Sequence, residues 1–314
     1  ILWVALGFLG LIITSSISLD FIRKISPLAL VINIFLLIIV LIPGLSDKSY
    51  GARRWINIAG FNLQPTELIK LTLSIYLAAW LAKKRNFIPF LAVLGFILGL
   101  IMLQPDLGTS IVIILIGVAV YYISGAKLTH LIITGLIGSF SGLALILSSP
   151  YRKARLLTFL NPASDPLGSS YHITQALIAI GSGGFWGLGL GQSRQKYQFL
   201  PQVTTDSIFA IVSEEIGFFG TSILVIALFA FIQRGFRIAR LAKDDFSKLL
   251  ATGITSWIGI QTIINLGAML ALLPLTGVPL PFISYGGSSM IVMLTGVGLL
   301  LNISKDQLSL KKKR

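Results

Sequence analysis

The stretch Leu128-Thr-His-Leu-Ile-Ile-Thr-Gly-Leu-Ile-Gly-Ser-Phe-Ser-Gly-Leu-Ala-Leu-Ile-Leu147 contains no Asp, Glu, Lys or Arg. A helix that spans a bilayer needs about 20 predominantly apolar residues, and this stretch has that length. Comparable apolar stretches recur along the chain, separated by polar segments. We therefore predict a polytopic membrane protein built from helices.

The composition excludes the other broad classes of protein. Of the 314 residues, 55% are hydrophobic and only 11% are charged, and the mean hydropathy is +0.89. Soluble domains contain about 25% charged residues, so a water-surrounded globule is excluded. The same values exclude a disordered chain, and the unbroken apolar runs exclude a β-barrel, which needs alternating residues.

Nine stretches are predicted to span the membrane. The expected fold is therefore all-α, a single bundle of about nine transmembrane helices over residues 1–314. The predicted spans are Ile1–Leu19, Leu28–Pro43, Pro65–Leu81, Ile88–Leu103, Leu107–Ser124, Leu128–Leu147, Ser207–Ile232, Ala251–Leu273 and Ser288–Ile303.

The basic residues predict the orientation. Sixteen of the 25 Lys and Arg residues fall on one side of the predicted membrane, eight fall on the other, and Lys70 lies inside a span. Basic loops are typically cytoplasmic, so we place the first side, with the C-terminal Lys311–Arg314, in the cytoplasm. An odd number of spans leaves Ile1 outside, and we expect one further helix upstream. Topology explains most of the net charge of +14, so we predict no nucleic-acid partner.

Three long connections are expected to form the outer surface. They are Gly44–Gln64, Ser148–Asp206 and Pro274–Gly287. The second is too long for a simple turn and contains an amphipathic segment, Tyr171–Ile180. A Gly-rich run, Gly181–Gly191, follows it; without a preceding strand or a P-loop Lys, this run is typical of close packing and flexible gating.

Asp206 is the best-placed candidate base. It ends the longest outer connection, follows the basic Arg194 and Lys196, and immediately precedes a predicted span. A carboxylate at a helix start can cap the helix, and one facing an external, negatively charged substrate can act as a general base. The spacing alone favours neither role.

Other acids lie at or below the outer surface. Glu67 and Lys70 are three residues apart on one helix, which predicts an ion pair inside the bilayer that is structural or forms a wall of a polar cavity. Asp106 follows Pro105 at a helix start and is predicted to cap it. Of the adjacent Glu214 and Glu215, one is expected to find a basic or hydroxyl partner, with a proton relay as the alternative.

Two further segments carry candidate binding residues. Arg53 and Arg54 precede Trp55 in a stretch that either anchors at the membrane interface or clamps a phosphate or diphosphate. The run Pro279–Gly287 must be non-helical beside Ser288, and such backbone at membrane depth is buried in protein or lines a cavity. The chain has no Cys, and its two His residues match no metal spacing.

With these residues in place, the chain resembles the SEDS family, the FtsW/RodA-type proteins of bacterial cell-wall synthesis. The matching motifs run through nearly the whole chain in the family's order: Gly51-Ala-Arg-Arg-Trp-Ile-Asn57, Gln64-Pro-Thr-Glu-Leu-Ile-Lys70, Gln104-Pro-Asp-Leu-Gly-Thr109, Asn161-Pro-Ala-Ser-Asp-Pro-Leu-Gly168, Gly189-Leu-Gly-Gln192, Leu200-Pro201 with Thr205-Asp206, Ile208-Phe-Ala210, Glu214-Glu215, and Leu280-Pro-Phe-Ile-Ser-Tyr-Gly-Gly-Ser-Ser289. The run Gly191-Gln-Ser-Arg-Gln-Lys196 resembles the division-type FtsW branch more than the elongation-type RodA branch.

The resemblance implies a peptidoglycan glycosyltransferase for cell division or cell shape. Such proteins polymerise lipid II into glycan strands on the outer face of the bacterial cytoplasmic membrane, beside a class B penicillin-binding protein. The family's essential aspartate maps onto Asp206, which is implied to be the base, to hold Mg²⁺ or Mn²⁺, or both in turn. The candidate substrate-binding residues are Arg53, Arg54, Lys196, Gln104, Asp106, Ser284 and Ser288, and the family's intramembrane ion pair maps onto Glu67 and Lys70.

The chain also departs from the family pattern. Where the family usually reads Pro-Glu-x-His-Thr-Asp, this chain has Pro201-Gln-Val-Thr-Thr-Asp206. Gln202 and Thr204 thus remove one charge and one titratable ring beside the candidate base. Two alternatives therefore stay in view: a flippase for the same lipid-linked precursor, and a non-enzymatic scaffold that recruits a transpeptidase.

Overall fold

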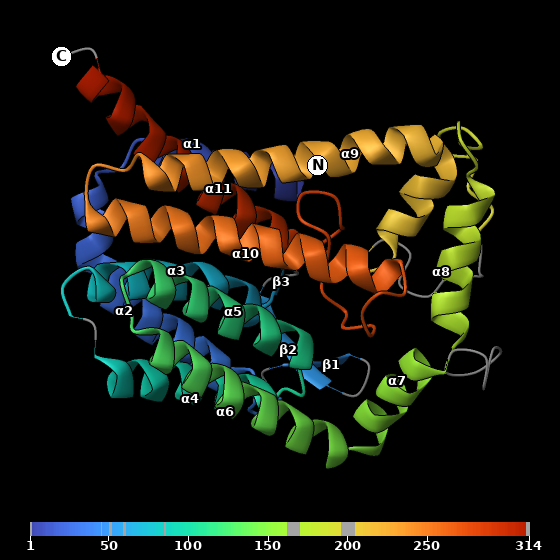
Figure 1. Ribbon diagram of the computed structural model, residues 1–314, viewed down its shortest axis with the longest axis horizontal. Helices are drawn as coiled ribbons and strands as arrows, with labels where there is room; N and C mark the ends of the chain where they lie inside the picture. The colour runs from blue at the N-terminus through green and yellow to red at the C-terminus, as the bar shows by residue number, and fades with distance from the viewer. Residues whose placement is uncertain are drawn as a thin grey trace. The chain divides into compact units, whose positions relative to one another are not determined.

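The computed structural model describes residues 2–44, 46–49, 52–58, 61–84, 86–161, 170–195 and 205–311. These residues form helices and one small sheet (Figure 1). The helices are α1 Leu2–Thr14, α2 Leu19–Ile39, α3 Pro65–Leu81, α4 Phe87–Met102, α5 Leu107–Ile123, α6 Leu128–Leu147, α7 Pro150–Leu160, α8 Tyr171–Ser182, α9 Ile208–Arg240, α10 Asp245–Met269 and α11 Gly287–Lys311; the strands are β1 Asp47–Ser49, β2 Ala52–Ile58 and β3 Phe61–Leu63.

The helices confirm a polytopic membrane protein. Each predicted span corresponds to one helix, and five of them, α2, α6, α9, α10 and α11, are long and apolar enough to cross a membrane. Helices α1, α4 and α5 are shorter and also apolar. Apolar side chains along α6, including Ile132, Leu136 and Phe140, are exposed, as expected for a helix that faces lipid.

Helix α2 begins nine residues before the predicted start at Leu28. The hydroxyl of Ser18 accepts a hydrogen bond from the Phe21 N–H at 3.4 Å and caps the helix. The negative charge of Asp20 in the first turn interacts favourably with the positive end of the helix dipole. Pro27 lies inside the helix. The cap at Ser18 therefore places the start of the helix before the predicted one, with the charged residues Asp20, Arg23 and Lys24 inside α2.

The chain forms two compact units. The first consists of Ile1–Thr134, Ile232–Ile260 and Gly286–Arg314, and the second of Gly135–Phe231 and Gln261–Tyr285. In the first unit α3 is buried along most of its length, with contacts to α2, α5 and α11. Helix α1 packs along α11, where Asn302 Nδ2 donates to the carbonyls of Thr14 (2.8 Å) and Ile17 (2.6 Å).

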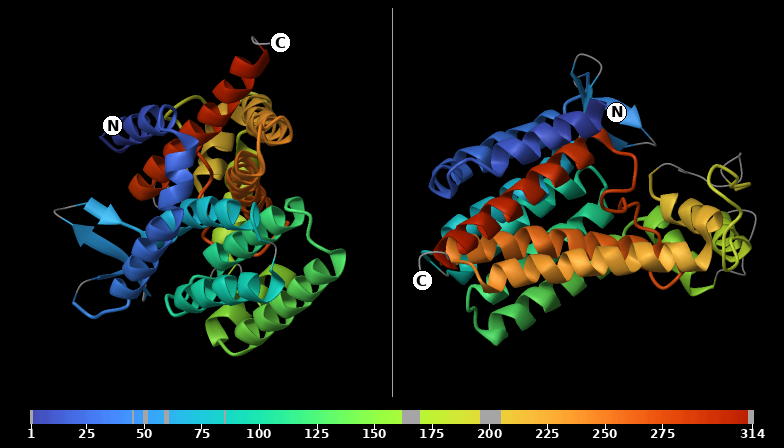
Figure 2. Two further views of the ribbon diagram at one scale, coloured as in Figure 1. Left: turned by 90° about the vertical axis from the view of Figure 1, so that its left-hand side faces the viewer. Right: turned by 90° about the horizontal axis from the view of Figure 1, so that it is seen from above.

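Figure 2 shows a small sheet, which the all-α prediction did not include. Its residues belong to the first unit. Its strands are antiparallel in the order β1-β2-β3. Ser288 Oγ donates to the Asn62 carbonyl (2.9 Å) and accepts from the Gln64 N–H (3.2 Å). These bonds tie the end of β3 to the first turn of α11.

The second unit contains α7, α8 and the first part of α9, which bends at Gly217 (φ 68°, ψ −175°). The amphipathic prediction for 171–180 is confirmed by α8. A Cβ on Gly187 would overlap the Glu215 carbonyl oxygen, and one on Gly217 would overlap the Gly187 nitrogen. The close packing predicted for Gly181–Gly191 is therefore confirmed, because two backbones meet there without side chains between them.

Candidate active site

Asp206 lies in the turn that leads into α9, and its side chain is half-buried. Its carbonyl oxygen accepts a hydrogen bond from Asn265 Nδ2 on α10 at 3.0 Å. The same Nδ2 donates to the Val278 carbonyl at 2.8 Å. One amide therefore joins the Asp206 turn to the irregular segment that follows α10.

Ser284 lies beside the same turn. Its Oγ donates to the Thr205 carbonyl at 2.6 Å and accepts from the Leu280 N–H at 2.7 Å. The structure thus brings together two residues, Asp206 and Ser284, that are far apart in sequence. A substrate-binding role for Ser284 stays a prediction, and in this geometry its hydroxyl holds the backbone next to Asp206.

His172 on α8 is a third residue whose side chain contacts this turn. Its Nε2 is hydrogen-bonded to Ser207 Oγ at 2.6 Å. Burial lowers the pKa of His172 from its ordinary value of 6.5, and the positive charge of Arg155 on α7 lowers this pKa further. Arg155 in turn donates to the Leu275 carbonyl at 3.1 Å.

Glu214 and Glu215 hold the end of the Gly-rich run. Glu214 is buried, and its carboxylate accepts from Ser193 Oγ (2.5 Å), the Arg194 N–H (3.1 Å) and the Gln195 N–H (3.4 Å). Glu215 Oε1 accepts from the Ser193 N–H at 3.4 Å. The predicted hydroxyl partner is confirmed. The adjoining Lys196, like Gln202 and Thr204, lies outside the described residues.

Within the first unit, Arg54, Gln104 and Asp106 come together. Arg54 donates from Nε to the Gln104 carbonyl (3.1 Å) and from Nη2 to the Pro105 carbonyl (2.7 Å). Asp106 accepts from the N–H (3.0 Å) and the hydroxyl (2.8 Å) of Thr109, so the predicted cap of α5 is confirmed. Gln104 is buried, and its Nε2 lies 3.4 Å from the Leu37 carbonyl.

Arg53 lies in β2 opposite Lys48 and is half-buried. It therefore shares a short strand with Arg54, which places the two guanidinium-bearing residues on opposite faces of the pleat. Ser288, described above, connects β3 to α11. Substrate binding by Arg53, Arg54, Gln104, Asp106 and Ser288 stays a prediction.

Glu67 and Lys70 form the predicted ion pair. Lys70 Nζ lies 2.7 Å from Glu67 Oε1, and the two side chains are 2% and 4% exposed. Nζ also lies 5.5 Å from the ring centroid of Trp257, a cation–π arrangement. Glu67 Oε2 has no hydrogen-bond partner among the described residues.

The donor set for a divalent cation is small. The described part of the chain contains no group of three or more His, Cys, Asp or Glu residues that would hold a metal ion. Mg²⁺ is commonly bound by one or two carboxylates together with substrate phosphates. Asp206 would therefore be suited to bind such a cation if the phosphates of a substrate supplied further ligands.

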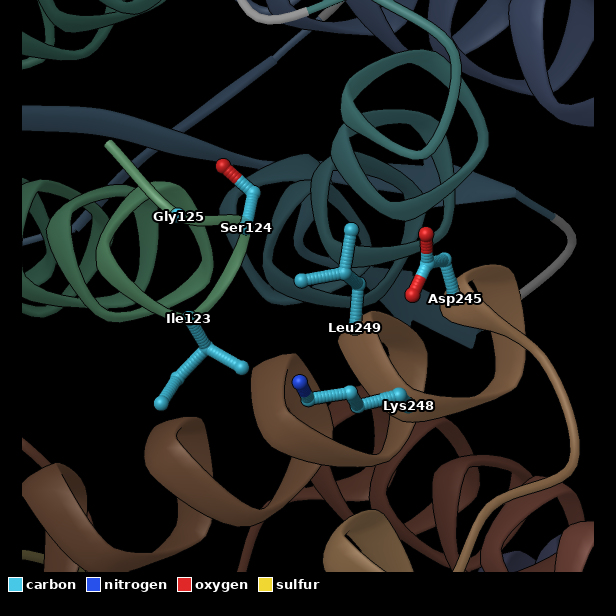
Figure 3. A pocket seen from close by; sticks show the side chains of 6 residues that line it. All are labelled: Ile123, Ser124, Gly125, Asp245, Lys248 and Leu249. Atoms are coloured by element: carbon cyan, nitrogen blue, oxygen red, sulfur yellow. The ribbon is translucent and has the colours of Figure 1, made fainter.

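A pocket of about 170 Å³ lies between the end of α5 and the start of α10 (Figure 3). Lys248 and Asp245 line it, along with residues 123–125 and Leu249. None of the predicted site residues lines this pocket. It lies at helix ends that the charge distribution assigns to the cytoplasmic side.

The sequence did not predict the partners that hold the Asp206 turn. The spacing of the two His residues matches no metal site and gives His172 no other role, and Asn265 lies within a predicted span. A buried amide in an apolar helix is itself a signal, because such a group needs a hydrogen-bond partner. The choice of Asp206 as that partner depends on tertiary structure.

Comparisons with known proteins agree with the motifs. A family model for FtsW, RodA and SpoVE, described as "Cell cycle protein", matches residues 1–309. Stage V sporulation protein E of Bacillus subtilis (strain 168) is 42% identical over 313 residues, which cover 97% of this chain and 86% of that protein. A probable peptidoglycan glycosyltransferase FtsW of Trichlorobacter lovleyi is 37% identical over 312 residues, covering 97% and 82%.

A solved structure is also similar. It is titled "Structural coordination of polymerization and crosslinking by a peptidoglycan synthase complex". The matching chain has a TM-score of 0.80 and 28% sequence identity, and the match covers 98% of this chain and 88% of that one.

Proposed function

Because the chain belongs to the FtsW/RodA/SpoVE family, we infer that it is a peptidoglycan glycosyltransferase of the cell cycle. The FtsW proteins among its relatives are named probable peptidoglycan glycosyltransferases. The substrate we propose is lipid II, which the enzyme polymerises into glycan strands. The observation that carries the mechanism is the position of Asp206, whose turn is held from α10 and from the segment after it.

The proposed reaction joins two sugars. The 4-hydroxyl of one sugar attacks the anomeric carbon of the other, and a new C–O bond forms as the bond to the lipid diphosphate breaks. The diphosphate leaves with the electron pair, and the configuration inverts from α to β. Asp206 takes the hydroxyl proton, and a general base of this kind contributes roughly 10²–10⁴-fold to the rate.

The leaving diphosphate builds negative charge, which cationic groups stabilise. Arg53, Arg54 and Lys196 are the proposed cations. A Mg²⁺ or Mn²⁺ ion, when bound by Asp206 and the diphosphate, would supply further positive charge. Arg54 also fixes the turn at Gln104 and Pro105 through its two bonds to backbone carbonyls, so its loss would affect both binding and local structure.

The protein is a multi-pass membrane protein, and we propose the outer face of the bacterial cytoplasmic membrane as its working surface. The proposed partner is a class B penicillin-binding protein that crosslinks the glycan strand. Support comes from the similar structure, whose title refers to polymerisation and crosslinking by one synthase complex.

A flippase for the same lipid-linked precursor is the second candidate. The buried Glu67–Lys70 pair, with one carboxylate oxygen lacking a partner among the described residues, favours it, because charged groups inside a membrane commonly mark a pathway. A flippase would depend on Glu67, whereas a glycosyltransferase depends on Asp206.

Glycan synthesis from lipid II by the purified full-length protein with its candidate partner tests the proposal. Asp206→Asn keeps the size of the side chain and removes its basicity, so we expect polymer from the wild type and a loss of roughly 10²-fold or more in the variant. The matched control is Asp244→Asn, because Asp244 caps α10 through Ser247 and has no proposed catalytic role. Wild-type-like polymerisation by Asp206→Asn would remove the general-base assignment, and no polymer from folded, partner-bound wild type would favour a flippase or a scaffold.

A further inference from the structure

Three consecutive residues before α9 are each held by a side chain from a different segment. The Thr205 carbonyl accepts from Ser284 and the Asp206 carbonyl accepts from Asn265. Ser207 is bonded through its hydroxyl to His172. The turn is therefore held at three successive positions, at the backbone of Thr205 and Asp206 and at the side chain of Ser207.

The bond to Ser207 differs from the other two because it joins two side chains. Ser207 is fully buried, and a buried hydroxyl that loses its partner carries a desolvation cost. The Ser207 carbonyl oxygen also accepts a hydrogen bond from the Ala210 N–H at 3.0 Å, in the first turn of α9. A displacement of Ser207 therefore moves both the start of α9 and the neighbouring Asp206.

His172 is suited to hold this position as a neutral ring. It comes from α8, where a buried environment and the nearby Arg155 both disfavour its protonated form. His172 therefore brings an imidazole to the residue directly after the base.

We propose that His172 is a positioning residue for Asp206, acting through its hydrogen bond to Ser207. The bond fixes the turn so that the Asp206 carboxylate meets the acceptor hydroxyl. This inference rests on the proposed function, since it concerns the geometry of the proposed base. It assigns a role in the reaction to α8, an element outside the predicted spans.

Four variants test it in the full-length protein with its partner, assayed with lipid II. His172→Phe keeps a ring and removes the nitrogen, His172→Gln keeps a group able to bond Ser207, Ser207→Ala removes the hydroxyl, and a double variant combines His172→Phe with Ser207→Ala. Misplacement of a catalytic group by about 1 Å costs on the order of 10²-fold, so we expect His172→Phe to lower kcat by roughly tenfold to a hundredfold. KM should stay close to the wild-type value, because the proposed role concerns the chemical step.

The other variants separate positioning from a purely structural role. His172→Gln should recover most of the lost kcat, and the double variant should be no slower than the worse single variant, because both changes break one bond. Thermal unfolding of each purified variant checks that it is folded. Wild-type kcat in His172→Phe, no recovery in His172→Gln, or additive losses in the double variant would each overturn the inference alone. No polymer from the wild type would overturn the proposed function as well.

Discussion

The Cα atom of Gly277 faces the carboxylate of Asp206: a Cβ built on Gly277 would lie 3.2 Å from Asp206 Oδ2. Gly277 has a φ of +72°, a conformation that favours glycine. It precedes Val278, whose carbonyl is held by Asn265. The segment after α10 therefore presents bare backbone to the carboxylate of the candidate base.

Gly277→Ala should reduce polymerisation by crowding this carboxylate. A left-handed Ala costs about 1–2 kcal/mol, and the added methyl group competes for the space beside Oδ2. The control is Gly44→Ala, because Gly44 also has a positive φ (+95°) but nothing within 4 Å of its Cβ position. We expect similar losses of thermal stability in both variants and a loss of kcat only in Gly277→Ala. Equal activities would show that the space beside Asp206 is not used.

Glu214→Gln should loosen the end of the Gly-rich run. The Glu214 carboxylate accepts bonds from three consecutive residues, and a hydrogen bond to a charged group contributes about 1.5–3 kcal/mol. Arg194 is exposed, so trypsin cleavage after it reports on this loop. We expect faster cleavage in Glu214→Gln than in the wild type.

Glu215→Gln is the matched control for that experiment. Its carboxylate accepts a bond of 3.4 Å from the Ser193 N–H, whereas Glu214 accepts from three residues and binds the Ser193 hydroxyl at 2.5 Å. A smaller increase in cleavage is therefore expected. If the two variants were cleaved equally fast, the loop would not depend on the buried Glu214.

The sequence predicted the helical framework well because each span is decided by local composition. A run such as 128–147 can only be stable in water-free surroundings as a helix, whatever its neighbours are. Two features of the fold, the start of α2 and the strand β2, do not follow from apolar composition. The start of α2 depends on a cap at Ser18, and β2 is a short strand within a polar connection, where pairing rather than apolar length decides the structure.

The candidate site was predicted only in part. Local spacing predicted the cap at Asp106 and the Glu67–Lys70 pair, because each depends on residues close together in sequence. The role of Asp206 came from its place in the chain and from the family resemblance, and it stays a prediction. The contacts of Asn265 and His172 join residues tens of positions apart. No periodicity or spacing encodes such contacts, so they become visible only when the chain is folded.

Acidification should destabilise the protein through His172. Its pKa in the folded protein is below the ordinary 6.5, so between these two values the unfolded chain binds more protons. The contribution of the neutral His172 ring to the free energy of unfolding is then fully present above about pH 6.5, and it is lost as the pH falls through the folded-state pKa. Thermal midpoints measured between about pH 7.5 and 5 should fall, and less steeply in His172→Gln. Arg155→Gln removes one cause of the shift and should also flatten the decrease, whereas parallel curves for all three proteins would contradict this account.

Lys70→Met should be strongly destabilising. Removal of one member of a buried ion pair typically costs about 3–5 kcal/mol, because the remaining charge is left without compensation. The Glu67 carboxylate would then be buried with neither the 2.7 Å contact to Nζ nor a partner for Oε2 among the described residues. Lys24→Met is the control, since Lys24 is an exposed lysine on α2, and its thermal midpoint should change little.

The double variant of Glu67→Gln with Lys70→Met decides what the pair does. Replacing both charges of a buried pair by neutral groups is often close to neutral for stability, so this protein should fold when Lys70→Met alone does not. If the pair is structural, the folded double variant should polymerise lipid II at a rate near the wild-type value. A folded double variant without activity would instead show that the charged pair serves the reaction itself, because the helix framework would be intact while the charges were gone.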